Sequence, residues 1–468
     1  MRGIDTKPRL AVMAILVGAL VGCMPAYRAA PPQSQVAPPE QWREDVAGTS
    51  AVRADWWRAF GDSRLTALVE TALARNTDVL TAVARVDEAR ALARVADSAR
   101  WPTLDAAAGV QSARALGSAG VATTHSAQPE LQANWEVDLW GRLRQQAKAA
   151  TLQYQATRAE RDGVALTVAA TTSESYIALL ALDAQLDITR ATAVSRASGL
   201  ELAQQQAQLG YISQLELTQS QSEYEAILQA VPQLEQAIRQ QENALRLLVG
   251  DLPGAVLRGG RLGDMQSLQM PAALPSELLE RRPDIAQASL LLAASDANLA
   301  SRRAEFLPQV SISASIGRMF IDSFDYDPFR VWSLGGSILA PLFSAGRLTA
   351  QVDEATAQRD QAAYAYRGTV LTAFGEVENA LSGVLRLQQQ MDHAEKRRDI
   401  LKRSLAFAHD RYQAGYASYL DELDAQRNLY QMELTVVTLR QDQLDNFIAL
   451  YRALGGGWSD RALADSPQ

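Results

Sequence analysis

The sequence of 468 residues contains a single cysteine, Cys23. A lone cysteine cannot form a disulfide within the chain, so its thiol is free for another use. Aromatic residues make up only 6% of the chain, which favours long helices over the compact core of an enzyme. The 45 basic residues are outnumbered by 53 acidic ones, and the resulting net charge of −8 argues against a nucleic-acid partner.

Residues that carry catalysis or bind metals are scarce and scattered. The three histidines, His125, His393 and His409, have no second ligand at a metal-binding spacing. No glycine-rich phosphate loop and no Ser/His/Asp arrangement stands out, and Gly335-Gly336 lies within an alternating strand pattern. We therefore expect neither an enzyme nor a bound metal or cofactor.

The apolar run near the N-terminus is too short to cross a bilayer. It extends from Leu10 to Val21 and follows basic residues, as the core of a signal peptide does. Residues 1–22 are accordingly predicted to be a signal peptide.

The run ends in Leu20-Val21-Gly22-Cys23, which resembles the lipobox of bacterial lipoproteins. In those proteins the cysteine is lipidated and becomes the mature N-terminus; the alternative is a signal-peptide cysteine without a role. Met24, in place of an aspartate, implies sorting to the outer membrane. Several acyl chains would hold the chain stably at a bilayer. Residues 23–54 are predicted to be a lipidated N-terminus with a proline-rich, extended tether.

Two predicted helical hairpin tips share the pattern Gly-Tyr-x-Ser-x-Leu, and the second follows the first after 205 residues (415 − 210). The glycine can adopt the left-handed conformation that ends a helix, and the serine can cap the next helix. The tip residues are Gly210, Tyr211 and Ser213 in the first tip and Gly415, Tyr416 and Ser418 in the second.

Other motifs repeat at nearly the same offset, which indicates an internal duplication. Gly141-Arg142-Leu143 matches Gly346-Arg347-Leu348, and Pro102 matches Pro308. Each repeat is predicted to contain a helix, two strands, a long helix, a tip and a final helix. The predicted parts are a first repeat at 55–250, a connector at 251–275, a second repeat at 276–455 and a C-terminal tail at 456–468.

The predicted helices are long and resemble coiled coils. Residues 142–209 and 347–414 contain no convincing break and would each extend roughly 100 Å. Residues 63–100 are predicted to form one helix, and we hypothesise that it stacks end to end with a helix at 213–249, beside the long helix. A heptad seam follows the second tip, and Arg427 is one of its polar interruptions.

Four segments of about ten residues alternate between apolar and polar side chains, near the length that spans a membrane. An apolar face toward lipid and a polar face toward a lumen are typical of a membrane barrel, although a half-exposed soluble sheet alternates too. Four strands cannot close a barrel, and open edges are not tolerated in lipid. Strands that span would therefore require oligomerisation. The segments are 104–110, 131–139, 310–316 and 332–338.

Several motifs resemble the TolC-like outer-membrane efflux family, in its lipoprotein branch associated with resistance–nodulation–division pumps. They are Trp56-Trp57-Arg-Ala-Phe60-Gly-Asp62, Trp135-Glu-Val-Asp-Leu-Trp-Gly-Arg142, Leu274-Pro-Ser-Glu-Leu-Leu-Glu-Arg-Arg-Pro-Asp-Ile285 and the segment from Arg411 to Arg427. The resemblance implies a homotrimer in the outer membrane, with a twelve-stranded β-barrel continued across the periplasm by an α-helical barrel. It also implies a periplasmic adaptor and an inner-membrane efflux pump as partners, with small toxic compounds as cargo.

The resemblance further implies a periplasmic gate at Tyr412, Leu420, Asp424 and Arg427, and adaptor docking at the two tips. Asp424 and Arg427 are three residues apart and share a helix face. They form either a solvated ion pair worth about 0.2–0.5 kcal/mol or a movable contact that sets the cost of closing. Replacing both residues with alanine would make the channel leaky.

Two other functions stay open on the sequence alone. One is an outer-membrane channel for protein secretion, and the other is a coiled-coil lipoprotein scaffold without a pore. The lipobox and the Leu-Glu-Arg-Arg-Pro-Asp motif favour small-molecule efflux. The sequence does not specify the exported compound.

Overall fold

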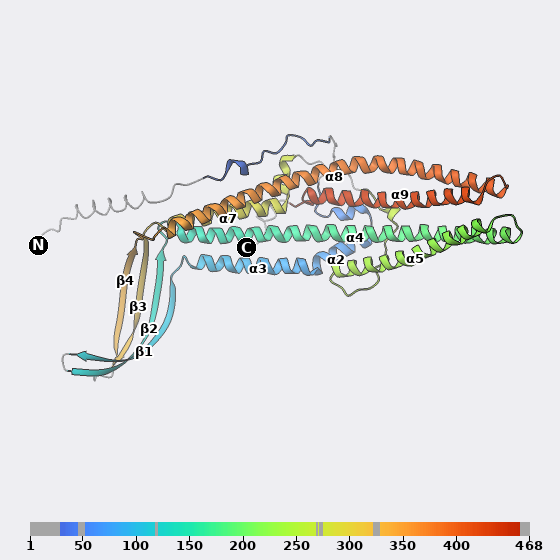
Figure 1. Ribbon diagram of the computed structural model, residues 1–468. Coiled ribbons are helices and arrows are strands. Elements are labelled where there is room, and N and C mark those ends of the chain that lie inside the picture. Colours follow the sequence, from blue (N-terminus) through green and yellow to red (C-terminus); the bar gives the residue numbers. More distant parts are fainter. Residues whose placement is uncertain are drawn as a thin grey trace. The chain divides into compact units, whose positions relative to one another are not determined.

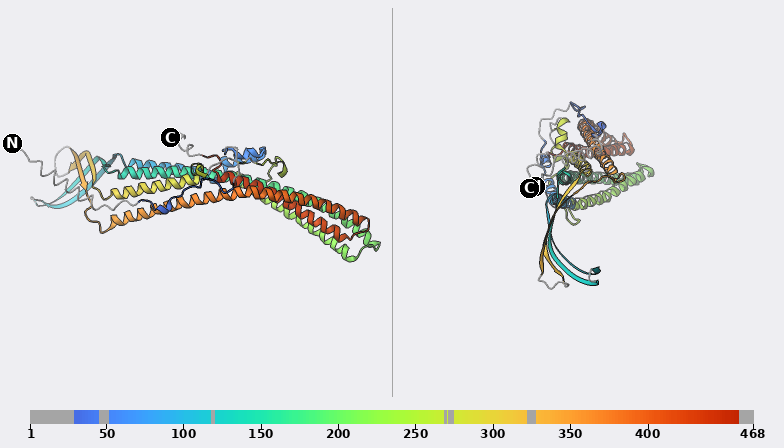
Figure 2. Two further views of the ribbon diagram at one scale, coloured as in Figure 1. Left: turned by 90° about the horizontal axis from the view of Figure 1, so that it is seen from above. Right: turned by 90° about the vertical axis from the view of Figure 1, so that its left-hand side faces the viewer.

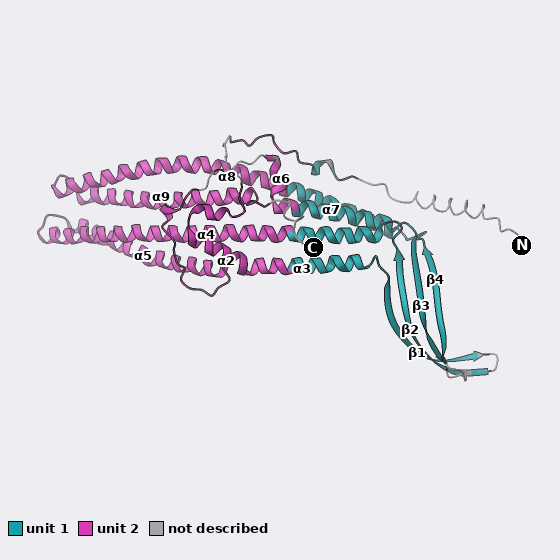
Figure 3. Ribbon diagram, turned by 180° about the vertical axis from the view of Figure 1, so that it is seen from behind, with its two compact units in different colours: residues 1–35, 85–158, 287–368 teal, residues 36–84, 159–286, 369–468 magenta. Residues whose placement is uncertain are grey.

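The computed structural model describes residues 29–44, 52–117, 120–267, 270, 275–321 and 328–458. The predicted signal peptide, Cys23 and most of the C-terminal tail lie outside the described residues. The fold is mainly helical with a curled antiparallel sheet (Figure 1). It divides into two compact units (Figure 3): unit 1 is Met1–Gln35, Arg85–Arg158 and Gln287–Gly368, and unit 2 is Val36–Ala84, Ala159–Ala286 and Thr369–Gln468.

The long helices confirm the sequence prediction to within one residue. Helix α4 (Arg142–Gln208) and helix α8 (Arg347–Gln413) each contain 67 residues. Each is followed by a tight tip and a helix of 35 residues, α5 (Gln214–Leu248) or α9 (Tyr419–Ala453). The same pair of helices is thus built twice. Short 3-10 turns lie at Pro32–Ser34, Trp56–Phe60, Leu262–Asp264 and Pro275–Glu277.

The prediction of one helix over 63–100 is wrong. The chain breaks at Asn76 into α2 (Ser63–Arg75) and α3 (Thr77–Ser98). The side-chain oxygen of Asn76 accepts the backbone N–H of Asp78 at 2.8 Å, so it caps α3 instead of continuing α2. The second repeat also breaks, between α6 (Leu278–Arg281) and α7 (Pro283–Ala304), here directly before a proline.

The last helix of each repeat ends against one of these breaks. The side-chain amide of Asn76 donates to the carbonyl of Leu248 at 2.9 Å, so the end of α5 meets the start of α3. The stacking hypothesis therefore holds only for α3, because α2 packs its Leu65 and Val69 in one cluster with Leu245 of α5. In the second repeat, Arg282 Nη1 donates to the carbonyl of Ala453, at the end of α9, at 3.0 Å.

Gly455, just after α9, packs directly on the break of the second repeat. Its φ is +86°, and an added Cβ would lie 1.7 Å from the carbonyl oxygen of Arg281. Gly415 has a similar φ of +76°, but an added Cβ there would meet none of the described atoms within 4 Å.

We expect Gly455→Ala to lower the unfolding temperature much more than Gly415→Ala. Both substitutions carry the left-handed backbone cost of about 1–2 kcal/mol, and only the first adds a clash with backbone. Thermal unfolding followed by circular dichroism measures the difference. Equal decreases for the two variants would contradict this packing.

The sheet has four antiparallel strands in chain order, β1 (Thr103–Gly117), β2 (Gly120–Val137), β3 (Gln309–Ile321) and β4 (Phe329–Leu339). All four predicted strands are present. Their lengths of 15, 18, 13 and 11 residues exceed the ten expected. In β1 and β2 the extra length comes mostly from alanine, serine, threonine and glycine, whose weak hydrophobicity gives little alternation to detect.

Strand pairing places apolar residues on one face of the sheet and polar residues on the other. On one face Ile316 lies opposite Leu131 and Trp332. On the other face Ser315 lies opposite Gln132 and Ser333. The apolar face is not a buried core, because Trp332 is 75% and Leu334 70% exposed. The sheet therefore offers an apolar surface to its surroundings.

The sheet also has two open edges. Within the described residues, β1 pairs only with β2, and β4 pairs only with β3. The strands curve together as a curled ribbon (Figure 2). Unpaired strand edges need a partner in lipid, because no water is available to satisfy their backbone groups.

The core of unit 2 explains one of the sequence motifs. Trp56 and Phe60, from the short turn before α2, are 1% and 0% exposed within a cluster that includes Ile177 and Ile448. Asp62 caps α2 and accepts a hydrogen bond from the Tyr176 hydroxyl at 3.0 Å. The Trp-Trp-Arg-Ala-Phe-Gly-Asp motif therefore fixes the turn and the start of α2.

Candidate functional site

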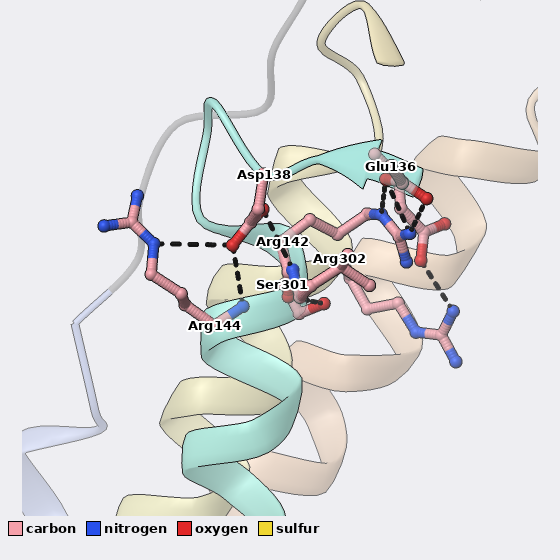
Figure 4. A network of polar contacts seen from close by, with 8 residues as sticks. Glu136, Asp138, Arg142, Arg144, Ser301 and Arg302 are labelled. Atoms are coloured by element: carbon pink, nitrogen blue, oxygen red, sulfur yellow. Dashed lines mark hydrogen bonds and ion pairs between the residues drawn. The ribbon is translucent and has the colours of Figure 1, made fainter. Parts of the chain in front are cut away.

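The junction of β2 and α4 is held by charged groups (Figure 4). Arg142 pairs with Glu136 at 2.7 Å, and Asp138 accepts the backbone N–H of Arg144 at 2.8 Å. The Ser301 hydroxyl, on α7, donates to the carbonyl of Arg142 at 3.1 Å. The Trp-Glu-Val-Asp-Leu-Trp-Gly-Arg motif thus fixes the sheet to the first long helix within unit 1.

Both hairpin tips have the predicted conformation. Gly210 and Gly415 have φ of +78° and +76°. The Ser213 hydroxyl accepts the N–H of Glu216 at 3.2 Å, and Asp421 accepts the N–H of Ser418 at 3.1 Å. The tips also expose two aromatic rings, because Tyr211 is 78% and Tyr416 79% exposed.

A cluster of three charged residues, here named the latch, joins the two hairpins within unit 2. Arg427 on α9 pairs with one oxygen of Glu223 on α5. The other oxygen of Glu223 pairs with Arg196 on α4 at 2.9 Å. The hydrogen bond from Arg427 is the main cause of the lowered pKa of Glu223. One carboxylate therefore connects the first hairpin to the second.

The direct partner of Arg427 is not Asp424 but Glu223, although the charge of Asp424 also contributes to the raised pKa of Arg427. Asp424 accepts a hydrogen bond from Asn428 Nδ2 at 3.0 Å, while Arg427 turns to Glu223. A spacing of three residues places two side chains on one helix face, but a carboxylate on a neighbouring helix competes for the same guanidinium. Glu223 lies 204 residues from Arg427, beyond the reach of any local pattern.

Two tyrosines make a second contact between the hairpins. The Tyr412 hydroxyl donates to Gln206 Oε1 at 2.5 Å, and the Ser220 hydroxyl donates to the Tyr419 oxygen at 3.2 Å. The two rings lie 5.5 Å apart, and burial raises the pKa of Tyr412 to about 12. These phenols therefore stay neutral donors or acceptors over the physiological pH range.

The structure separates the four predicted gate residues into two groups. Tyr412 and Arg427 contact the first hairpin through Gln206 and Glu223. Leu420 is 41% exposed, and Asp424 bonds only within α9 among the described residues. Glu223, Arg196 and Gln206 are additional candidates that the sequence did not indicate.

No group of three or more His, Cys, Asp or Glu side chains that could hold a metal ion occurs in the described residues. The polar contacts at the tips are hydrogen bonds and ion pairs between helices. Such contacts can break and re-form when hairpins move.

The chain is similar to known channel proteins over almost its full length. The sequence profile described as outer membrane efflux protein matches residues 68–251 and again 274–456. The pyoverdine export outer membrane protein OpmQ of Pseudomonas aeruginosa is 34% identical over 447 residues, covering 92% of this chain and 94% of OpmQ. The cation efflux system protein CusC of Escherichia coli is 32% identical over 411 residues, covering 86% of this chain and 88% of CusC.

Solved structures agree with the sequence comparison. A CusC crystal structure superposes with a TM-score of 0.82 at 29% identity and covers 93% of this chain and 100% of that chain. The open state of the MtrE outer membrane channel of Neisseria gonorrhoeae gives 0.80 at 28% identity, covering 93% and 98%. The chain belongs to the outer membrane efflux protein family.

Proposed function

We propose that three copies of the chain form one channel, each contributing its four strands to a twelve-stranded barrel in the outer membrane. The observation that carries the proposal is the two-faced sheet with open edges at β1 and β4. Lipid matches the exposed apolar face, and a neighbouring copy satisfies each edge. Trimers by native mass spectrometry, together with conductance in planar bilayers, test it. Monomers or an absence of conductance would refute it.

The helices continue the conduit through the periplasm toward an adaptor and an inner-membrane pump. At about 1.5 Å per residue, α4 and α8 each extend roughly 100 Å. The exposed tips, centred on Gly210 and Gly415, dock the adaptor. A photo-reactive residue at Tyr211 or Tyr416 should cross-link to the adaptor in cells, whereas adaptor cross-links from other positions alone would refute this docking surface.

Cys23 carries a lipid that anchors the chain to the membrane. The carbonyl of Ala29 accepts a hydrogen bond from Arg359 at 3.2 Å, twelve residues (359 − 347) into α8. That point is about 18 Å from the start of α8. The six residues from Cys23 to Ala29 reach about 20 Å, enough to return to the sheet end of the helix. Radiolabelled palmitate should label the wild type and not Cys23→Ser.

The latch and the tyrosine contacts form the gate, together with Leu420 and Asp424. The channel is closed when Arg427 pairs with Glu223 and Tyr412 with Gln206. It opens when the second hairpin moves away from the first and breaks both contacts. The cargo is a small toxic compound that the pump delivers, and sensitivity profiling of a deletion strain identifies it.

The gate should respond to acid through Glu223. Arg427 holds the pKa of Glu223 below its usual range, and opening removes that partner. The ion pair stabilises the closed state at every pH above the ordinary pKa of a carboxyl group. This stabilisation is lost as the pH falls through the lowered pKa of Glu223. We expect the open probability to stay constant from about pH 7 to 5 and to rise only below about pH 4.5.

Single-channel recordings over this pH range test the expectation, with Arg427→Ala as the control, because its Glu223 has already lost that partner. A rise that is complete by about pH 6 would exclude Glu223 as the titrating group.

A further inference from the structure

A cavity of about 690 Å³ lies between the two hairpins within unit 2. We name it the hairpin cavity; helix α4 forms one wall, and α8 and α9 form the others. Its volume is in the range of sites that hold small organic molecules. Apolar lining comes from Leu202, Leu405, Ala406 and Leu429, with the rings of Tyr412 and Tyr419.

The hairpin cavity contains one buried carboxylate, that of Glu422. Glu422 is 7% exposed and receives hydrogen bonds from His409 Nδ1 at 3.0 Å and from Gln426 Nε2 at 3.1 Å. The amide nitrogen of Gln413 lies 2.8 Å from His409 Nε2.

Lys402 also lines the hairpin cavity, but its side chain is 52% exposed and pairs at 3.7 Å with Glu433, which lies outside the lining. Glu422, in contrast, is buried and is held by hydrogen bonds from His409 and Gln426. A buried carboxylate costs less free energy beside a cation, so a cation that enters the cavity is favoured.

A second polar group in the lining also needs a partner. Gln426 is 9% exposed, and its Oε1 is buried without a hydrogen-bond partner among the described residues. Buried acceptors of this kind are rare, because the lost hydrogen bond to water is not replaced. A ligand with an N–H group would satisfy this oxygen as well as the carboxylate.

We propose that the hairpin cavity binds a small organic cation, a protonated amine or guanidine with an apolar or aromatic body. The cationic N–H groups donate to Glu422 and to Gln426 Oε1, and the body packs against Leu202, Leu405 and the tyrosine rings. Aromatic faces also attract a cation directly. Because the ligand would contact both hairpins, it holds them together; this consequence alone rests on the proposed gate.

Dansylcadaverine, a fluorescent primary amine with an aromatic body, tests the binding on the purified full-length protein in detergent. We expect saturable fluorescence enhancement, with affinity at least about tenfold higher than that of N-acetyl-dansylcadaverine, because one charge-assisted hydrogen bond has that effect. The acetylated probe has the same body without the charge, so it also controls for uptake into micelles. Equal binding of the two probes, or no saturable binding, would overturn the proposal.

Two substitutions place the binding in the hairpin cavity. Glu422→Gln keeps the volume and removes the charge, and it should weaken dansylcadaverine binding at least about tenfold. Gln426→Leu should weaken it severalfold. Glu201→Gln, the same charge change at an exposed position on α4, should have no effect. Unchanged binding in Glu422→Gln with an unchanged unfolding temperature would overturn the assignment.

A conductance measurement separates this proposal from the proposed gate. In planar bilayers, dansylcadaverine should reduce openings of the wild type and have little effect on Glu422→Gln. If Glu422→Gln loses the binding of dansylcadaverine but the amine does not change the conductance of the wild type, the result would support the site and contradict its link to the gate. A chain without conductance that still binds the amine selectively would contradict the proposed function and leave the site intact.

Discussion

Replacing Arg427 with alanine should convert a mostly closed channel into a leaky one. The substitution removes the ion pair that joins the second hairpin to Glu223. The Arg427 side chain is 49% exposed, so solvent screening limits the pair to about 0.5–1 kcal/mol per copy. If three copies must separate together, the sum of about 1.5–3 kcal/mol raises the open probability roughly 10- to 100-fold.

The matched control for this experiment is Arg411→Ala, the same charge change in the second hairpin. Arg411 is exposed and donates to the carbonyl of Tyr416 in its own tip at 3.3 Å, so its loss should leave the open probability near that of the wild type. Open probability in planar bilayers and sensitivity of cells to vancomycin measure the leak. Similar effects of Arg411→Ala and Arg427→Ala would contradict the latch and favour a simple charge effect at the tip. Glu223→Ala is a less specific test, because it also leaves the buried Arg196 without its carboxylate.

Ala314→Arg, in the middle of β3, should prevent assembly in the outer membrane. Ala314 lies opposite Ala133 and Leu334 on the apolar face of the sheet. A charged side chain at the lipid midplane of a barrel costs about 2–4 kcal/mol, and a trimer would carry three of them. We expect loss of heat-resistant trimers from outer-membrane fractions.

Ser313→Arg, one residue away, is the control because it lies on the opposite face. Ser313 pairs with Asn134 and Gly335, in the row that we assign to the lumen. This variant should assemble normally and reduce the conductance for cations, because its new charges line the pore. If Ser313→Arg prevents assembly and Ala314→Arg does not, the two faces of the sheet are assigned the wrong way round.

The elements with strong local signals were predictable from sequence. Helices α4 and α8 lack internal breaks, and the glycine and serine at each tip define where one helix ends and the next begins. The apolar alternation of β3 and β4 likewise located both strands. In each case the chemistry that determines the structure lies within a few neighbouring residues.

The features that the sequence did not predict depend on side chains that compete for the same hydrogen-bonding group, or on residues that lie far apart in the chain. Asn76 breaks the chain between two helices, α2 and α3, because its side chain captures the N–H of Asp78. The beginning of β2, from Gly120, pairs with β1 although its small residues alternate weakly. The partner of Arg427 was also missed, because Glu223 comes close only through the packing of two hairpins. Sequence periodicity contains no information on which of two carboxylates an arginine selects.

Single-channel recording of a cross-linked latch tests the account most directly. Cysteines would replace Glu223 and Arg427 in a chain whose own Cys23 is changed to serine, and a reducible bismaleimide would join them. We predict that the uncross-linked variant opens more often than the wild type, that the cross-linked channel stays closed, and that reduction of the linker restores opening. A cross-linked channel that conducts as well as the reduced one would contradict a gate that opens by separation of the two hairpins.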